Sequence, residues 1–132
     1  MSRVVIAGSR EKYWVGYTFQ EILDIVNQAV IDSKFDITEV VSGKATGIDA
    51  FGEIYAKQSG IPIKEFPAQW DLYPKTAGPI RNREMAEYCD AAIVVCNGFT
   101  SGSSNMIKEM ERLKKPVFVR NVRLSGLENF YE

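Results

Sequence analysis

Short apolar runs alternate with segments of helical periodicity along this chain, and this alternation constrains its fold more than any other feature. Residues 3–8 (RVVIAG) have the length and the β-branched composition of a buried strand, whereas apolar residues recur at helical spacing in residues 17–31. The same reasoning predicts strands at 3–8, 37–42, 61–66, 91–96 and 116–120, and helices at 17–31, 48–58, 79–88 and 103–113.

Strands that alternate with helices form βαβ units, which build a parallel sheet with helices on both faces. We therefore predict an α/β fold with a single doubly wound, mostly parallel five-stranded sheet. Pro62 favours an edge or strand-start position for the third strand. A chain of 132 residues suits one domain, which we place at residues 1–120, followed by a C-terminal tail at 121–132.

The overall charge narrows the classes of partner. The net charge is −1, and 25% of the residues are charged, as in ordinary soluble proteins. This balance argues against a protein that coats nucleic acid, for which a basic excess is expected. No signal segment opens the sequence, and no apolar run reaches the roughly 18 residues of a membrane span. We expect a cytoplasmic protein that has no membrane partner.

The absence of histidine limits the chemistry. It excludes Ser-His and Cys-His catalysis and histidine-ligated metals within one chain. Cys89 and Cys96 are seven positions apart, which matches no zinc or redox spacing and favours burial as reduced thiols. We predict no metal site and no cofactor, and carboxylate, Lys, Tyr and Arg side chains remain as reactive groups.

Three glycine-containing turns directly follow predicted strands, at residues 8–10 (GSR), 42–49 (SGKATGID) and 97–104 (NGFTSGSS). In a parallel sheet these turns share the edge at which ligands bind. Glycine permits close backbone approach, and free N–H groups at a helix N-terminus attract phosphate. The turns therefore predict a three-loop pocket for a nucleotide-type ligand, formed by Gly8, Ser9, Arg10, Ser42, Gly43, Lys44, Gly47, Asp49, Gly98, Thr100, Ser101, Gly102, Ser103 and Ser104.

Each turn also has a plainer interpretation. The first is compatible with an ordinary turn and a solvated Arg10, and Asp49 and Ser103 are compatible with simple stabilisation of a helix start. The spacing of the second turn does not match a Walker A loop, and the third turn lacks the dinucleotide pattern G-x-G-x-x-G.

The segment before the fourth strand adds further candidates. Arg81 and Asn82 are predicted in the first turn of a helix, where a cation opposes the helix dipole and an anionic ligand would offset the cost. Both are assigned to the binding site. Arg83 is assigned instead to an exposed ion pair with Glu87. Trp70 could stack on a base, or it could anchor its loop to the core.

Taken in order, these motifs resemble the SLOG superfamily of Rossmann-like nucleotide-ligand proteins, most closely its YspA-type branch. The resemblance covers residues 3–120 and rests on residues 8–10, 42–49, 66–70, 77–82 and 98–103. It implies a Rossmann-like fold and a nucleotide-derived small molecule as partner. By analogy with the superfamily, it also implies a homodimer or a higher homo-oligomer.

Two branches of the superfamily suggest different activities. Residues 42–49 resemble a turn of the DprA branch, which loads recombinase on single-stranded DNA. Residues 81–85 and 90–103 resemble the LOG phosphoribohydrolases, in which an arginine corresponding to Arg81 and a glutamate are catalytic. Met106 occupies the glutamate position here. Catalysis would therefore require Asp49 to replace that carboxylate, with Arg81 holding the phosphoribosyl group.

Three functions follow from these observations. The favoured one is the sensing or sequestering of a nucleotide-derived ligand, such as an ADP-ribose-like or cyclic nucleotide species. The alternative is an N-glycosidase that acts on nucleoside monophosphates. DprA-like binding of single-stranded DNA is the least favoured, because the net charge is slightly negative and aromatic and basic residues are rarely interleaved.

Overall fold

Five parallel strands form one sheet in the order β3-β2-β1-β4-β5. The computed structural model describes residues 2–124. The strands are β1 (Ser2–Gly8), β2 (Ile37–Ser42), β3 (Ile63–Glu65), β4 (Ala91–Cys96) and β5 (Val117–Asn121). The predicted doubly wound parallel sheet is confirmed, with the short, proline-preceded β3 at one edge.

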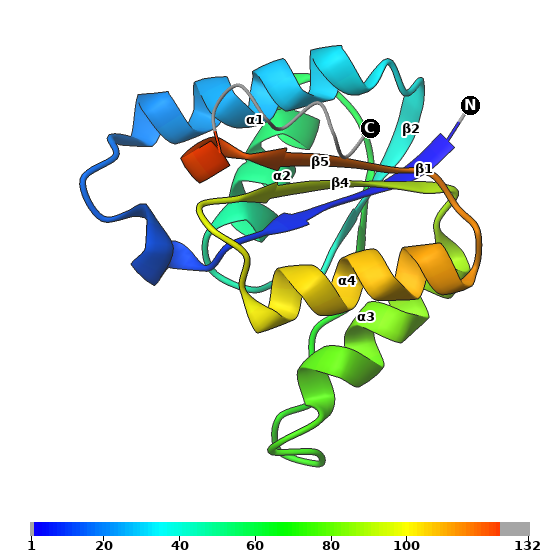
Figure 1. Ribbon diagram of the computed structural model, residues 1–132. Helices are drawn as coiled ribbons and strands as arrows, with labels where there is room; N and C mark the ends of the chain where they lie inside the picture. Colours follow the sequence, from blue (N-terminus) through cyan, green and yellow to red (C-terminus); the bar gives the residue numbers. More distant parts are fainter. Residues whose placement is uncertain (1, 125–132) are drawn as a thin grey trace.

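Helices cover both faces of the sheet (Figure 1). Helices α1 (Phe19–Ser33) and α2 (Ile48–Gln58) lie on one face, and α3 (Ala77–Tyr88) and α4 (Ser101–Arg112) lie on the other. Successive side chains of a strand point to opposite faces, so Ile6 belongs to the core beneath α1 and α2, whereas Val5 belongs to the core beneath α3 and α4. Every residue of β4 is buried, as expected for a central strand covered on both sides.

Local signals explain several boundaries. Helix α1 begins with a capping box, in which the Glu21 amide donates to Thr18 Oγ1 (3.1 Å) and the Thr18 amide donates to Glu21 Oε1 (2.8 Å). Two short 3₁₀ helices were not predicted, namely η1 (Glu11–Trp14) and η2 (Val122–Leu124). The first is anchored by Trp14, whose indole Nε1 donates to the carbonyl of Ser9 (3.1 Å).

Three predicted helix starts are wrong by two residues. Helix α1 begins at Phe19 rather than at Tyr17. Helix α3 begins at Ala77 rather than at Pro79, so Arg81 and Asn82 lie in its second turn and the argument from the helix dipole does not apply to them. Helix α4 begins at Ser101, and its N-cap is Thr100 rather than Ser103.

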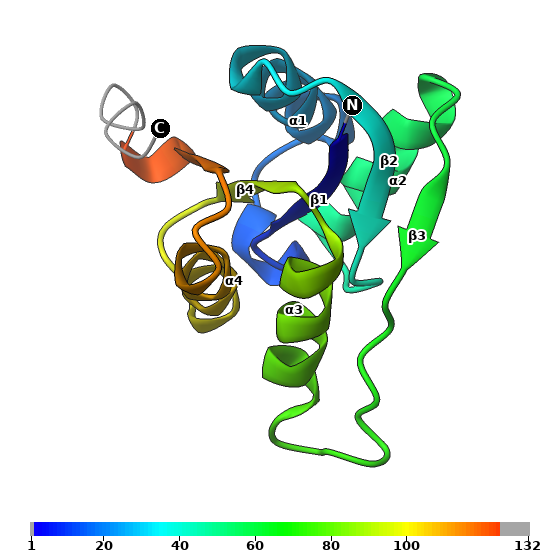
Figure 2. The same cartoon turned by 90° about the vertical axis from the view of Figure 1, so that its right-hand side faces the viewer.

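The ends of the chain and the long crossover complete the fold. Strand β5 extends to Asn121, so the segment predicted as an irregular tail starts inside the sheet, and residues 125–132 of that segment lie outside the described residues. In Figure 2 the segment between β3 and α3 leaves the sheet and passes beyond the N-terminus of α3. Within residues 2–124, no helix combines the length and the apolar character that crossing a bilayer requires.

Candidate functional site

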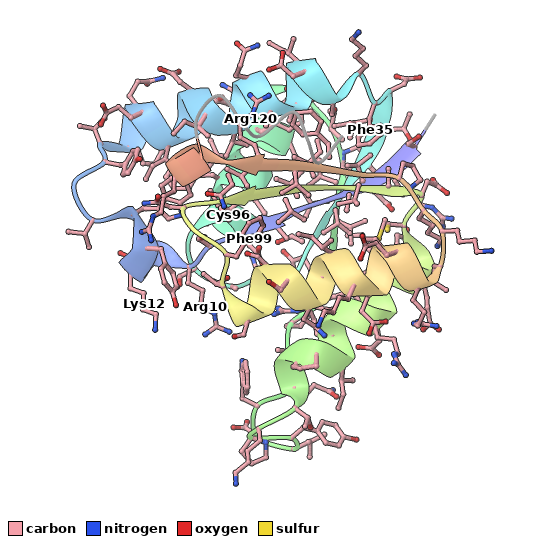
Figure 3. All side chains as sticks on the ribbon, in the orientation of Figure 1. Arg10, Lys12, Phe35, Cys96, Phe99 and Arg120 are labelled. Atoms are coloured by element: carbon pink, nitrogen blue, oxygen red, sulfur yellow. The ribbon has the colours of Figure 1, made fainter. Side chains whose placement is uncertain are left out.

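A pocket of about 420 Å³ lies where β1 and β4 end side by side. From these two ends the chain leaves toward opposite faces of the sheet, into α1 and α4, and ligands of doubly wound proteins bind at such a point. Figure 3 shows Arg10 and Lys12 at the end of the molecule where α4 begins. The predicted residues that line the pocket are Gly8, Arg10, Asp49, Trp70, Arg81, Asn82, Thr100, Ser101, Gly102 and Ser103.

The first loop joins the other two. A Cβ on Gly8 would overlap the carbonyl oxygen of Val95, so only glycine allows β1 and β4 to approach this closely here. Ser9 does not line the pocket. Its buried Oγ accepts a hydrogen bond from the Asn97 amide (3.0 Å), and its carbonyl accepts one from the Ile48 amide (3.2 Å). Ser9 thus connects the loops that follow β1, β2 and β4.

The second loop is held mainly by its own polar network. Ser42 Oγ donates to Glu53 Oε2 (2.6 Å), and Lys44 Nζ pairs with Glu53 (3.0 Å) and Glu65 (3.3 Å). Lys44, predicted to contact a ligand, is therefore engaged by α2 and β3. Gly47 has a φ of +85°, and a Cβ on it would overlap the Ser9 carbonyl oxygen, which explains the glycine.

Arg81 connects the second loop to α3. Its Nη1 donates to the carbonyl of Gly43, and its Nε donates to Asn82 Oδ1 (2.9 Å). The residue is 8% exposed, and burial lowers the pKa of its guanidinium, although an arginine stays charged at neutral pH. In the part of the chain that the structure describes, Arg81 Nη2 has no hydrogen-bond partner, so this end of the fork is available to a ligand.

Asp49 lies beside Arg81, in the first turn of α2. Its Oδ2 accepts a hydrogen bond from the Ala45 amide (3.1 Å) in the preceding loop. Burial raises the pKa of Asp49 to about 6, against the opposing effects of the Ala45 hydrogen bond and the charge on Arg81. Asp49 as a residue is 4% exposed and lines the pocket.

Asn82 and Arg83 join α3 to α4. Asn82 Nδ2 donates to Asn105 Oδ1 (2.9 Å), which fixes the amide at the pocket wall. Arg83 was predicted to pair with Glu87 on its own helix, but its guanidinium instead pairs with Glu109 of α4 (3.3 Å). The prediction failed because α4 packs along α3 and supplies a partner that sequence spacing does not reveal.

The third loop delivers the N-terminus of α4 to the pocket. Thr100 Oγ1 accepts a hydrogen bond from the Ser103 amide (3.3 Å), while Ser101 and Gly102 lie at the pocket wall. Gly98 and Ser104 lie outside the lining. The Gly98 amide donates to Asn121 Oδ1 (3.0 Å), and the Ser104 amide is used within the helix.

Several lining residues were missed by sequence reasoning. Lys12 and Tyr13 belong to η1, which immediately follows the Gly8–Arg10 turn, and extending that turn by one helical turn would have found them. Lys75 lies in the long loop after Trp70. Met106 is buried and lines the pocket with an apolar side chain.

The lining is cationic and partly aromatic. Its charged side chains are four cations (Arg10, Lys12, Lys75 and Arg81) and one carboxyl group (Asp49), which sum to +3 when all are ionised. Trp70 and Tyr13 supply ring surfaces, and the Arg10 guanidinium lies 5.7 Å from the Trp70 ring centroid. Residues 2–124 contain no group of three Cys, Asp or Glu residues able to hold a metal ion. An anion that also carries a flat ring matches this chemistry.

Comparison with known proteins identifies the fold. No family model and no curated protein matches the chain. Among solved structures, the chain is similar to DNA processing protein A (DprA) from Streptococcus pneumoniae, with a TM-score of 0.63 and 21% identity. The match covers 89% of this chain and 49% of DprA, so the chain spans about half the length of that protein. This likeness shows that the chain has a Rossmann-like fold of the kind found in DprA.

Proposed function

We propose that this protein is a ligand-binding member of the SLOG group and binds a nucleotide-derived anion, of the ADP-ribose-like or cyclic nucleotide class, in the pocket at the carboxyl end of β1. The observation that carries the proposal is the convergence of four cations, a helix N-terminus and two aromatic rings on one pocket at the switch point. Its volume of about 420 Å³ lies within the usual range for small-molecule sites.

Each part of the pocket suits one part of such a ligand. The free Nη2 of Arg81, the Arg10 guanidinium and the first turn of α4 offer donors to a phosphate group. Trp70, which is 44% exposed at the pocket wall, offers a ring face to a base. The homo-oligomer expected from the resemblance remains a prediction.

The test should use cations that do not also hold the fold together. Arg10 and Lys75 are exposed pocket residues, whereas Arg81 also binds the Gly43 carbonyl, so its replacement would disturb the second loop. We expect Arg10→Ala and Lys75→Ala each to weaken binding about 10- to 100-fold, the worth of a charge-assisted hydrogen bond. Lys108→Ala, which removes an exposed lysine of α4 outside the pocket lining, is the matched control and should bind normally.

Calorimetry and thermal-shift assays with AMP, cyclic AMP, NAD and ADP-ribose provide the readout. The proposal fails if none of these compounds binds, or if Lys108→Ala loses as much affinity as Arg10→Ala. A single-stranded oligonucleotide belongs in the same series, because the similar structure is that of a DNA processing protein. Binding of the oligonucleotide alone would favour the nucleic-acid alternative.

A second candidate function is hydrolysis of an N-glycosidic bond. It is favoured by the position of Asp49 and Arg81 on the same pocket wall, and by the pKa of about 6 for Asp49, which suits a general acid or base. Arg81 would hold the phosphoribosyl group, and Asp49 would take the role that Met106 cannot fill. Chromatographic release of free base from AMP, lost in Asp49→Asn, would support this activity. Equal release by wild type and variant would exclude Asp49 as the catalyst.

A further inference from the structure

Asp49 is anomalous in a pocket built for anions. Among the described residues that line the pocket it is the one carboxylate, and it is nearly as buried as the apolar core. Its Oδ2 accepts the Ala45 N–H, and Oδ1 has no hydrogen bond among the described residues. Burying a carboxylate is costly unless its oxygens accept hydrogen bonds, and within residues 2–124 only one of the two oxygens does so.

The charges around Asp49 come from several elements. Arg10 faces it from the loop after β1, Arg81 faces it from α3, and Glu53 lies one turn further along α2. Lys12 and Lys75 line the same pocket. Because Arg81 donates to the Gly43 carbonyl and to Asn82, it affects Asp49 through its charge rather than through a direct hydrogen bond.

An anionic ligand in this pocket would favour the protonated form of Asp49 over the ionised form. The ligand would neutralise the field of Arg10 and Arg81 and would place a second negative charge near the carboxylate in a medium of low polarity. Two anions that share such a site repel each other, and protonation of the weaker acid relieves the repulsion. The neutral carboxylic acid can then donate its O–H to a ligand oxygen.

We propose that the pocket takes up its anionic ligand together with one proton, and that Asp49 receives this proton and donates a hydrogen bond to a phosphate oxygen of the ligand. The proton comes from solvent, and no bond of the ligand changes. This inference rests on the proposed function and deepens it, because it assigns Asp49 as a hydrogen-bond donor to the phosphate of the ligand.

Burial has already brought the carboxyl group close to this state. The pKa of Asp49 is about 6 without a ligand, so a further increase of about two units on binding would leave about nine-tenths of the carboxyl groups protonated at about pH 7. The free protein would be mostly ionised at that pH. Close to one proton should therefore be taken up for each ligand bound.

Calorimetry with ADP-ribose tests this inference, because its pyrophosphate has a constant charge between about pH 5 and pH 8. Titrations at about pH 7 in PIPES and in imidazole, whose ionisation enthalpies differ, give the number of protons taken up. We expect close to one proton in wild type at this pH, with affinity falling up to tenfold per pH unit between about pH 6 and pH 8. Asp49→Asn keeps a donor and should bind with no proton uptake and no pH dependence.

Asp24→Asn is the matched control, because Asp24 is exposed on α1 and accepts a hydrogen bond from Gln20. This variant should behave as wild type. Binding of ADP-ribose without proton uptake, or a pH dependence retained in Asp49→Asn, would overturn the inference while leaving the proposed function intact. If ADP-ribose does not bind, sulfate replaces it as a probe of constant charge. The ¹³C carboxyl resonance of Asp49, identified by its absence from Asp49→Asn, should then titrate at higher pH with sulfate, and an unchanged midpoint would refute the inference.

Discussion

Replacing Asp49 by asparagine should stabilise the folded protein at neutral pH. The pKa of Asp49 rises from 3.8 to about 6 on folding, and each unit corresponds to about 1.36 kcal/mol, so the ionised side chain costs about 3 kcal/mol above pH 6. An asparagine cannot ionise and resembles the neutral acid, and its side-chain oxygen can still accept the Ala45 N–H, whose effect is already included in that pKa. The net gain expected for Asp49→Asn is therefore about 3 kcal/mol at pH 8.

The sign follows from proton linkage. The folded protein binds this proton more tightly than the unfolded chain does, so the free energy of unfolding falls as pH rises from about 4 to about 6. Asp49→Asn lacks this contribution. The advantage of the variant should therefore be absent near pH 4, grow through this window and remain constant above it.

Urea unfolding followed by circular dichroism, at intervals between about pH 4 and pH 8, measures the difference between variant and wild type. Taking this difference cancels the titration of the carboxylates that both proteins share. In thermal melts at pH 8 the gain corresponds to an increase in Tm of about 10–15 °C. Asp24→Asn, at an exposed position on α1, should show no such trend. The reasoning is refuted if Asp49→Asn is less stable than wild type at pH 8, or if the difference does not change with pH.

Three further outcomes test the local structure by urea unfolding. Gly47→Ala should lower the free energy of unfolding by at least about 3 kcal/mol, because the positive φ of Gly47 and its contact with the first loop both exclude a Cβ. Gly60→Ala should lower it by about 1 kcal/mol, because Gly60 has a positive φ but open space around it. Equal losses in the two variants would contradict this reasoning. Thr100→Ala should lose about 1 kcal/mol through the missing N-cap of α4, and an unchanged midpoint would show that this cap is dispensable. Arg83→Ala should lower the free energy of unfolding by less than about 1 kcal/mol, and by less still at high salt, because the arginine side of its ion pair with Glu109 is largely exposed. A large loss that does not depend on salt would refute this.

The fold could be predicted because its strongest signals are local. β4 reads as a continuous apolar run since it is covered on both faces, and α1 shows a clear apolar stripe. α3 was placed two residues late because its buried side includes Gly78, Arg81 and Asn82, which hide the helical period. η1 was missed because its residues are polar apart from Tyr13 and Trp14, and three-residue periods give little signal in so short a segment.

The candidate site could be predicted only as far as the edge of the sheet. Strand order and the glycine turns indicate which residues meet there, but the direction of each side chain depends on partners far away in the sequence. Lys44 looked like a phosphate ligand, yet it pairs with Glu53 on α2 and Glu65 on β3. Ser9 looked like a hydroxyl donor to the ligand, yet its side chain accepts a hydrogen bond from Asn97. The assignment of the remaining residues to a ligand stays a prediction.

The positions of the two tryptophans determine what the intrinsic fluorescence of this protein can report. Trp14 is 4% exposed, with its indole hydrogen-bonded to the Ser9 carbonyl, so its fluorescence depends on the intact core. Trp70 is 44% exposed at the pocket wall beside Arg10, within reach of a soluble quencher. The chain thus contains two optical reporters in separate environments, one for unfolding and one for occupancy of the pocket. Replacing either tryptophan by phenylalanine would isolate the signal of the other.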